Sequence, residues 1–326
     1  MVLEAGEAGD WVLKRARIKG RQLERLDIVL GALNQVGRGL SPPLMPEIRP
    51  LADRGHVLRA GGSAFYLMRK VSGRRADFRR FGDVLRVARA QARLHRASVA
   101  IVPRLIEALK CDPAADPRRT VVQSLETLDE LTERLRRFKR RRRPLLVFAR
   151  GGHRGFVELA RAAFEFFENP WLEHKRREKQ DGGENALAAC ALVLVHGDSH
   201  ENNYLMVDDA DRPPWMLDLE SSDLRPGVLD LIVPLQYFGR ANRWPIDRIE
   251  EIVAAYEAIR PLGPAEKALL GAQLIHPRHW ERSLRSLLKR RGRFKWGTAK
   301  NLWRSRRELA SKRAFAHHLY EHWRVD

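Results

Sequence analysis

The sequence predicts an α+β protein with a small strand-rich lobe followed by a large, mainly helical lobe. Three observations lead to this prediction: apolar runs separated by Gly-rich turns before Val71, helical periodicity after it, and a crowded polar loop between short apolar runs in the helical part. With 326 residues and 44% hydrophobic content, the chain is long enough for one large domain or two lobes. We expect a cleft between lobes of unequal size.

The part before Val71 predicts two hairpins and one helix. "MVLEA" and "WVLKRA" flank the turn "GEAGD", which indicates the first hairpin. Residues Arg21 to Val36 predict an amphipathic helix, because apolar residues recur at 3-4-3 spacing at Leu23, Leu26, Leu30 and Leu33. A Gly/Pro-rich connector, "GRGLSPPLMPEIRP", follows, and "HVLRAGGSAFYLMRKV" predicts a second hairpin that turns at Gly61-Gly62.

After Val71 the pattern becomes helical, with a few short strands. Helices are expected over Asp77–His95, Val122–Phe138 and Phe156–Glu168, the last ended by Asn169-Pro170. Short strands are expected at Leu192–Val195, Tyr204–Val207 and Trp215–Leu219, and helices fill the rest of the chain.

Composition limits the class of protein. The net charge of +20 favours anionic partners, but the arginines are spread along the chain and no nucleic-acid-binding motif accompanies them. We therefore interpret the charge as a solvated surface and do not expect nucleic-acid binding. We find no apolar run long enough to span a membrane and no signal peptide, and the two cysteines are far apart in sequence. These features predict a cytoplasmic protein.

The polar loop within "VLVHGDSHENNYLMV" allows three interpretations. The alternation of His196, Asp198 and His200 is compatible with a metal cluster, but no matching ligands occur nearby. An Asx-rich turn between strands is the plain structural alternative. The third interpretation uses Asn203, five residues after Asp198, and Asp218, twenty residues after it. A carboxylate that accepts a hydroxyl proton, followed by an amide and a second carboxylate that hold Mg²⁺, is the order used in kinase-like phosphoryl transfer.

The same segments resemble a known superfamily. "HGDSHENN" resembles the H-G-D-x-x-x-x-N loop of the aminoglycoside phosphotransferase and choline kinase superfamily, "MLDLE" its metal-binding motif, and "RPGVLDL" the segment after it. The finer resemblance is to the spore-coat CotS family, through "WVLKRAR", "AFYLMRKVSGRRADF" and "ARAQARLHRAS". The resemblance covers the chain from about Trp11 to beyond Tyr256 and implies a bilobal, protein-kinase-like fold.

The resemblance also implies roles for individual residues. Asp198 corresponds to the catalytic base, Asn203 and Asp218 to the Mg²⁺ ligands, and Lys14 to the lysine that pairs with the phosphates of ATP. Asp230 would start a helix in a structural role.

Two further assignments concern the small lobe. Glu24 is the candidate partner that orients Lys14, with an exposed helix carboxylate as the alternative and Asp27 as a competitor. Tyr66 to Arg69, with Met68, would form the hinge beside adenine. His196 is expected to brace the loop backbone.

One departure from the family pattern concerns the phosphate-covering hairpin. Only thirteen residues precede Lys14, and one strand, a turn and the lysine strand account for them. We therefore expect an N-terminally shortened N-lobe over residues 1–69 and a C-lobe over residues 70–326.

The expected function is ATP- and Mg²⁺-dependent phosphoryl transfer to a hydroxyl of a small molecule or spore-coat component. The alternative is a catalytically inactive, kinase-fold structural protein of the spore coat, since a scaffold needs none of the site residues. Its partners would be other spore-coat proteins. An anionic or sugar-like acceptor would suit the Arg-rich helices and their tryptophans, although core packing explains the tryptophans equally well: Trp171, Trp280, Trp296, Trp303 and Trp323.

Overall fold

The structure, a computed structural model, describes residues 2–3, 10–16, 21–51, 55–60, 63–110, 117–137, 144–180, 190–289 and 295–323. The chain divides into two compact units. Unit 1 comprises Met1–Pro113, Ala191–Phe238 and Arg248–Leu262, and unit 2 comprises Ala114–Cys190, Gly239–Asp247 and Gly263–Asp326. The predicted boundary between residues 69 and 70 falls inside unit 1, at the end of a strand, and stays a prediction.

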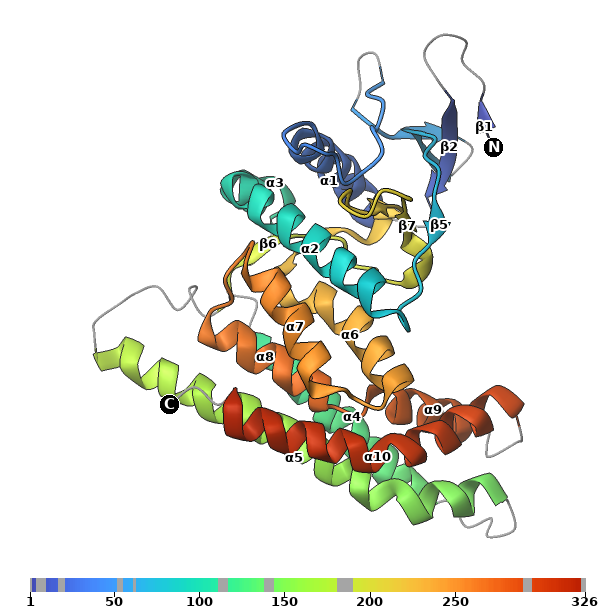
Figure 1. Cartoon of the computed structure of the whole chain (residues 1–326), viewed down its shortest axis with the longest axis vertical. Helices are drawn as coiled ribbons and strands as arrows, with labels where there is room; N and C mark the ends of the chain where they lie inside the picture. Colours follow the sequence, from blue (N-terminus) through green and yellow to red (C-terminus); the bar gives the residue numbers. More distant parts are fainter. Residues whose placement is uncertain are drawn as a thin grey trace. The chain divides into compact units, whose positions relative to one another are not determined.

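A four-stranded antiparallel sheet begins unit 1 (Figure 1). Its strand order is β1-β2-β4-β3, formed by β1 (Val2–Leu3), β2 (Trp11–Ala16), β3 (Leu58–Ala60) and β4 (Ser63–Arg69). Both predicted hairpins are confirmed by the pairing of β1 with β2 and of β3 with β4. The turn residues of both hairpins, 4–9 and 61–62, lie outside the described residues.

Helix α1 (Arg21–Arg38) follows β2 and confirms the predicted amphipathic helix. Its apolar stripe is buried, with Leu26, Leu30 and Leu33 at most 2% exposed. The connector after α1 runs beside β4, because an isolated antiparallel bridge joins Ile48 to Met68. Backbone bonds on both sides of this bridge, from Arg49 N to Leu67 O (2.9 Å) and from Arg69 N to Glu47 O (2.8 Å), fix the connector to β4.

The rest of unit 1 combines helices with two small sheets. The helices are α2 (Phe81–Ser98), α3 (Val102–Leu109), the first part of α6 (Val228–Asn242) and most of α7 (Ile246–Glu257). One sheet has the order β5-β7-β8, formed by β5 (Arg74–Arg75), β7 (Tyr204–Met206) and β8 (Trp215–Met216). The other pairs β6 (Leu192–Val195) with β9 (Asp223–Pro226). Strands were predicted at β6, β7 and β8, whereas α3, β5 and β9 were not.

Unit 2 consists of helices packed on one another. They are α4 (Pro117–Arg137), α5 (Pro144–Gln180), α8 (Pro264–Ile275), α9 (Arg278–Lys289) and α10 (Trp296–His322). The prediction that a helix ends at Asn169-Pro170 is wrong, because α5 continues through it to Gln180. Proline removes one backbone hydrogen bond from a helix interior, and a long helix tolerates that loss as a local defect.

The tryptophans of unit 2 divide into core and surface residues. Trp280 is 1% exposed, stacks on Phe156 at 4.1 Å between ring centroids and donates a hydrogen bond to His153 Nδ1 at 3.2 Å. Trp296 and Trp303, in contrast, are 72% and 53% exposed. Core packing therefore accounts for Trp280 but not for Trp296 or Trp303.

A buried lysine lies in the core of unit 2. Lys312 on α10 donates a hydrogen bond to His276 O (2.9 Å) and lies 4.4 Å from the Trp244 ring centroid. Burial lowers the pKa of Lys312 to about 7, opposed by the nearby Glu308 carboxylate. The amine of Lys312 therefore lies where its protonated, charged form is disfavoured.

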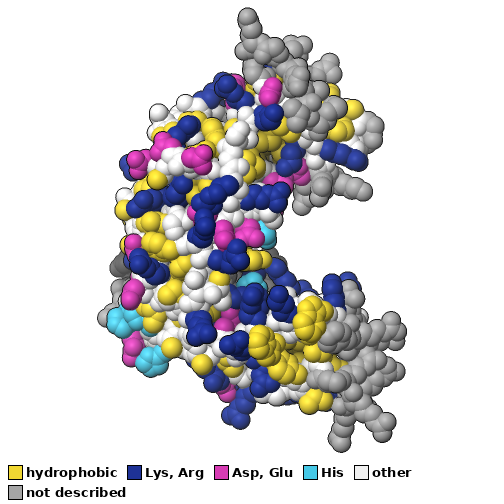
Figure 2. All heavy atoms as spheres, turned by 45° about the vertical axis from the view of Figure 1, so that its right-hand side comes forward, with side chains coloured by type: hydrophobic (Ala, Val, Ile, Leu, Met, Phe, Trp, Pro, Cys, Tyr) yellow, Lys and Arg dark blue, Asp and Glu magenta, His cyan; other side chains and the backbone are white. Residues whose placement is uncertain are grey.

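Lys and Arg side chains are distributed over the face shown in Figure 2. Acidic side chains lie among them, and several form ion pairs, for example Arg154 with Glu158 and Arg248 with Glu251. This distribution fits a solvated basic surface. Within the described residues, no helix is long and apolar enough to cross a membrane.

Candidate active site

The polar loop leads from β6 to β7 within unit 1. His196 follows β6 directly, and the 3-10 helix η4 (Glu201–Asn203) leads into β7. The apolar runs on either side are buried, since Val193, Leu194, Tyr204 and Met206 are all 0% exposed. These two strands therefore hold the loop at both ends.

Asp230 in the first turn of α6 anchors the loop through hydrogen bonds. Its Oδ2 accepts hydrogen bonds from His196 N (2.7 Å) and His95 Nε2 (3.1 Å), and its Oδ1 accepts from Gly197 N (3.0 Å) and Ser199 Oγ (2.9 Å). Burial by itself would raise the pKa of this carboxyl, but the bond from His95 and the other donors outweigh burial and lower it. Asp230 is thus a buried carboxylate with a structural role, as predicted.

His196 braces the loop from the other side. Its Nε2 donates a hydrogen bond to Leu217 O (2.6 Å), and its Nδ1 accepts one from Asp198 N (3.3 Å). This pair of bonds requires the neutral ring with the proton on Nε2. The predicted bracing role is what the contacts show.

Gly197 is required by the shape of the loop. Its φ of +79° lies in the left-handed region, and a Cβ atom added there would lie 2.0 Å from Ser221 O. Only glycine therefore fits directly before Asp198.

Three residues that support the loop were not predicted. Gln91 Nε2 donates to Ser199 Oγ (3.1 Å), Tyr204 Oη (2.9 Å) and Asp230 O (3.1 Å), and Tyr256 Oη bonds to His95 Nδ1 (2.7 Å). Gln91 and His95 are both 0% exposed. The signal was present in "ARAQARLHRAS", which places a glutamine and a histidine four residues apart on the apolar face of a helix.

The structure brings Asp198 and Asn203 together. Asn203 Nδ2 donates to Asp198 O (2.9 Å) and to Asp198 Oδ2 (3.1 Å). Its Nδ2 group therefore fixes the orientation of the Asp198 carboxylate. The amide oxygen of Asn203 points away from this pair of bonds and is the atom that a hard cation would bind.

Asp218 directly follows Leu217 and has a left-handed backbone, with φ 60° and ψ 55°. Leu217 N donates to Asn203 O (2.8 Å), so the segment that leads from β8 to Asp218 is bonded to the end of the polar loop. A left-handed conformation is costly for a residue other than glycine, and such residues concentrate at functional sites.

Lys14 on β2 reaches this cluster. Its Nζ lies 2.9 Å from Asp218 Oδ1, with the side chains 29% and 41% exposed. Lys14 is paired across the sheet with Tyr66 on β4, whose phenol is buried and has its pKa raised by burial and by Glu220 and Asp218. The ion pair therefore joins β2 to the segment that follows β8.

The structure does not bring Glu24 to Lys14. Glu24 is exposed in the first turn of α1, and among the described residues the ion partner of Lys14 is Asp218. The competitor Asp27 is engaged elsewhere, since its Oδ1 accepts bonds from His56 N (2.5 Å) and Val57 N (3.1 Å). The role of Glu24 stays a prediction.

Met68 is 7% exposed at the end of β4, next to the residues expected to form the hinge. Its neighbours Leu67 and Arg69 are bonded to the connector after α1, as described above. The segment expected to form the hinge is therefore hydrogen-bonded to the connector, and its role as a hinge and the adenine contacts at Met68 stay predictions.

The donor set suits a hard divalent cation. Asp218 supplies a carboxylate and Asn203 an amide oxygen, and Mg²⁺ prefers oxygen ligands completed by water and phosphate. No cluster of three or more His, Cys, Asp or Glu side chains suited to a metal occurs within the described residues, so the zinc-like interpretation of His196 and His200 receives no support there. Asp198 Oδ2 and the Lys14 ammonium complete a set of groups fit for phosphoryl transfer.

A small β-rich sheet with one helix, joined to helices that carry the polar loop, defines a protein-kinase-like α+β fold, as predicted. The chain matches the model of the APH phosphotransferase enzyme family over residues 2–269. The protein therefore belongs to this family. No match was found among the curated proteins.

Solved structures show the same fold. The aminoglycoside phosphotransferase from Alicyclobacillus acidocaldarius is 16% identical at a TM-score of 0.79, covering 99% of this chain and 89% of that one. A spectinomycin phosphotransferase in complex with ADP and spectinomycin is 13% identical at 0.53, covering 97% and 92%. A microcompartment-associated aminopropanol kinase is 14% identical at 0.51, covering 100% and 90%.

Proposed function

We propose that this protein is a phosphotransferase that moves the γ-phosphoryl group of ATP to a hydroxyl group of a small molecule or spore-coat component. The observation that carries the proposal is the meeting of Lys14, Asp198, Asn203 and Asp218 around one loop of unit 1. Membership of the phosphotransferase family supports it, as does the ADP bound in the spectinomycin phosphotransferase.

In the proposed reaction, Asp198 acts as the general base. Its carboxylate accepts the proton of the acceptor hydroxyl, whose oxygen forms a bond to the γ-phosphorus while the bond to the β–γ bridging oxygen breaks and ADP leaves. The bonds from Asn203 Nδ2 hold the carboxylate in place for that proton. General-base catalysis of this kind contributes about 10²–10⁴ to the rate.

Lys14 and Asp218 act on the phosphates. With the ion pair between them open, Lys14 would pair with the α- and β-phosphates, and Asp218 and Asn203 would hold Mg²⁺. The bound Mg²⁺ would offset the negative charge of the phosphates. Met68 is proposed to contact the adenine. Glu24 is proposed to orient Lys14 once the ion pair with Asp218 has opened.

Of the two proposed acceptor classes, the spore-coat component is supported by the likeness of "WVLKRAR" and "ARAQARLHRAS" to the CotS family. The rival is a catalytically inactive coat protein of the same fold. The two differ in whether the site turns ATP over.

Slow hydrolysis of Mg·ATP, with water as the acceptor, tests the proposal without knowledge of the substrate. Phosphate release is followed by ³¹P NMR for the wild type, for Asp198→Asn and for Asp211→Asn, an exposed acidic residue in the β7–β8 connection that serves as the matched control. We expect Asp198→Asn to bind Mg·ATP like the wild type but to lose about 10²-fold or more of the rate. Equal rates in the wild type and Asp198→Asn would disprove the base role, and no turnover in either would favour the inactive coat protein.

A further inference from the structure

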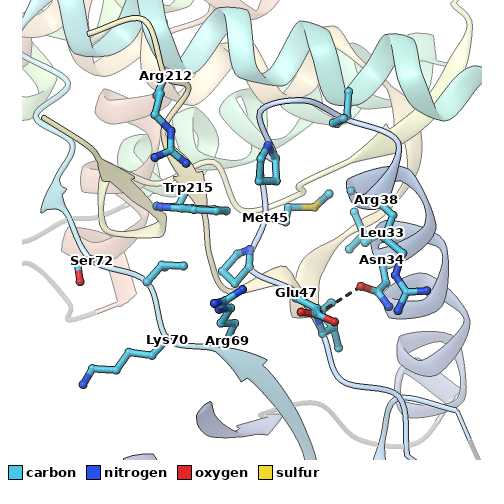
Figure 3. Close-up of a pocket in the computed structure, with 16 residues that line it drawn as sticks. Leu33, Asn34, Arg38, Met45, Glu47, Arg69, Lys70, Ser72, Arg212 and Trp215 are labelled. Carbon is cyan, nitrogen blue, oxygen red and sulfur yellow. Dashed lines mark hydrogen bonds between the residues drawn. The ribbon is translucent and has the colours of Figure 1, made fainter. Parts of the chain in front are cut away.

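Unit 1 has a pocket whose lining includes none of the residues Lys14, Asp198, Asn203 and Asp218. It has a volume of about 710 Å³, within the range of small-molecule sites. Its walls come from the C-terminal end of α1, the connector over residues 40–48, residues 69–72 after β4, and the β7–β8 hairpin (Figure 3). Three stretches that are distant in sequence, 33–48, 69–72 and 212–215, therefore enclose it.

The inner surface of the pocket is apolar. Leu33, Met45 and Ile48 are 1–5% exposed and form its base. Trp215 on β8 offers one large aromatic side chain to the wall. Such a surface gains from covering by an apolar, flat body.

Three arginines surround this apolar base. Figure 3 shows Arg212 beside Trp215 on one side of the pocket, Arg38 on α1 on the other, and Arg69 between them. None of the three forms an ion pair with another described residue, whereas Arg74 nearby is paired with Asp83 at 2.6 Å. Glu47 is the single carboxylate among the lining residues. The excess of positive charge favours an anion.

We propose that this pocket binds a small anionic molecule with an aromatic body. The aromatic part would lie on Trp215 and the buried apolar side chains, and a carboxylate or sulfonate would accept hydrogen bonds from Arg212, while Arg38 on the opposite wall adds positive charge. A guanidinium presents a planar fork of donors that matches such a group. Apolar contacts would then hold the aromatic body of the ligand, and the arginines would hold its anionic group.

The position of the pocket couples it to the proposed nucleotide site. Met216 N donates to Leu44 O (2.8 Å), so the wall segment is bonded to β8 two residues before Asp218. In the same connector, Glu47 O accepts a hydrogen bond from the backbone N–H of Arg69, the residue after Met68. A ligand that shifts the connector therefore changes nucleotide affinity, and nucleotide changes ligand affinity by the same factor. This coupling rests on the proposed function, whereas binding to the pocket does not.

Anilinonaphthalene sulfonate serves as the probe, because it joins an aromatic body to a single anion. We would titrate it against ¹⁵N-labelled protein and follow the indole N–H signal of Trp215, assigned by its loss in Trp215→Phe. We expect saturable binding that shifts this signal and weakens about tenfold in Arg212→Glu and Arg38→Glu. Arg89→Glu, an exposed arginine on α2 outside the pocket, is the matched control and should bind the probe as the wild type does.

Absence of saturable binding overturns the proposal, and so does unchanged affinity in Arg212→Glu. Complete displacement of the probe by ADP, with the Trp215 signal unmoved, also overturns it, since the probe would then occupy the nucleotide site. A failure of the proposed function has a different signature: ADP fails to bind, while the probe still binds and still depends on Arg212.

Discussion

Replacing Asp230 by asparagine tests whether one buried carboxylate holds the polar loop. The side chain is 2% exposed and accepts four hydrogen bonds, two of them from the backbone of the loop. Asparagine keeps one oxygen for two of the donors and turns an NH₂ group toward the other two. The Ser199 hydroxyl can turn away and His95 can take its other tautomer, but one of the two backbone N–H groups faces the NH₂ group whichever way the amide is turned.

The cost follows from the kind of bond that is lost. Hydrogen bonds to a charged group contribute about 1.5–3 kcal/mol each, and a buried donor without a partner costs about 1–3 kcal/mol. We therefore expect Asp230→Asn to lower the free energy of unfolding by about 3–5 kcal/mol at neutral pH. The loss is expected to shrink in acid, because the pKa of this carboxyl is lowered in the folded state, so its contribution disappears as pH falls through that value.

Urea unfolding followed by circular dichroism measures the difference. Glu251→Gln is the matched control, because it removes a carboxylate from an ion pair with Arg248 in which both side chains are at least half exposed. That change should cost less than about 0.5 kcal/mol. A cost below about 1 kcal/mol for Asp230→Asn would show that the loop does not depend on this anchor.

Three more predictions concern single residues. Gly197→Ala should lower the free energy of unfolding by at least about 1–3 kcal/mol, read as a fall in thermal midpoint, because its Cβ would meet Ser221 O at 2.0 Å in a left-handed backbone; an unchanged midpoint would contradict this. In the wild type, stability should rise between pH 7 and 10, because the unfolded chain holds the Lys312 proton that the folded chain has released, and Lys312→Met should flatten this rise, which urea midpoints across the range would reveal. Trp280→Ala should cost about 3–5 kcal/mol in urea unfolding through loss of the stack on Phe156, whereas Trp303→Ala, at the surface, should be nearly neutral.

Much of the fold was predictable because its signals are local. The Leu spacing in Arg21–Arg38 needs only a helix with one buried face, and β6 occupies Leu192–Val195, where the apolar run predicted a strand. The order of Lys14, Asp198, Asn203 and Asp218 along the chain predicted a candidate site, because phosphoryl transfer needs those groups together, and the structure places them near one another.

The features that escaped prediction depend on distant parts of the chain. The short strand β9 forms through pairing with β6, and its own sequence, "DLRP", carries little strand signal. Asp218 has a left-handed backbone, and its ion pair with Lys14 joins two residues that are far apart in the sequence. Gln91 gave a signal, a polar residue on an apolar helix face, but its three partners come from separate segments.

The dependence of ADP binding on Mg²⁺ tests the central claim, that Lys14, Asn203 and Asp218 form one nucleotide and metal site. Calorimetric titration with and without Mg²⁺ should give tighter binding with the cation in the wild type and in the control Asp211→Asn. In Asp218→Asn the advantage of Mg²⁺ should disappear, while ADP still binds without it, because Lys14 is released from its ion pair. No ADP binding by the wild type, or an undiminished effect of Mg²⁺ in Asp218→Asn, would contradict the account.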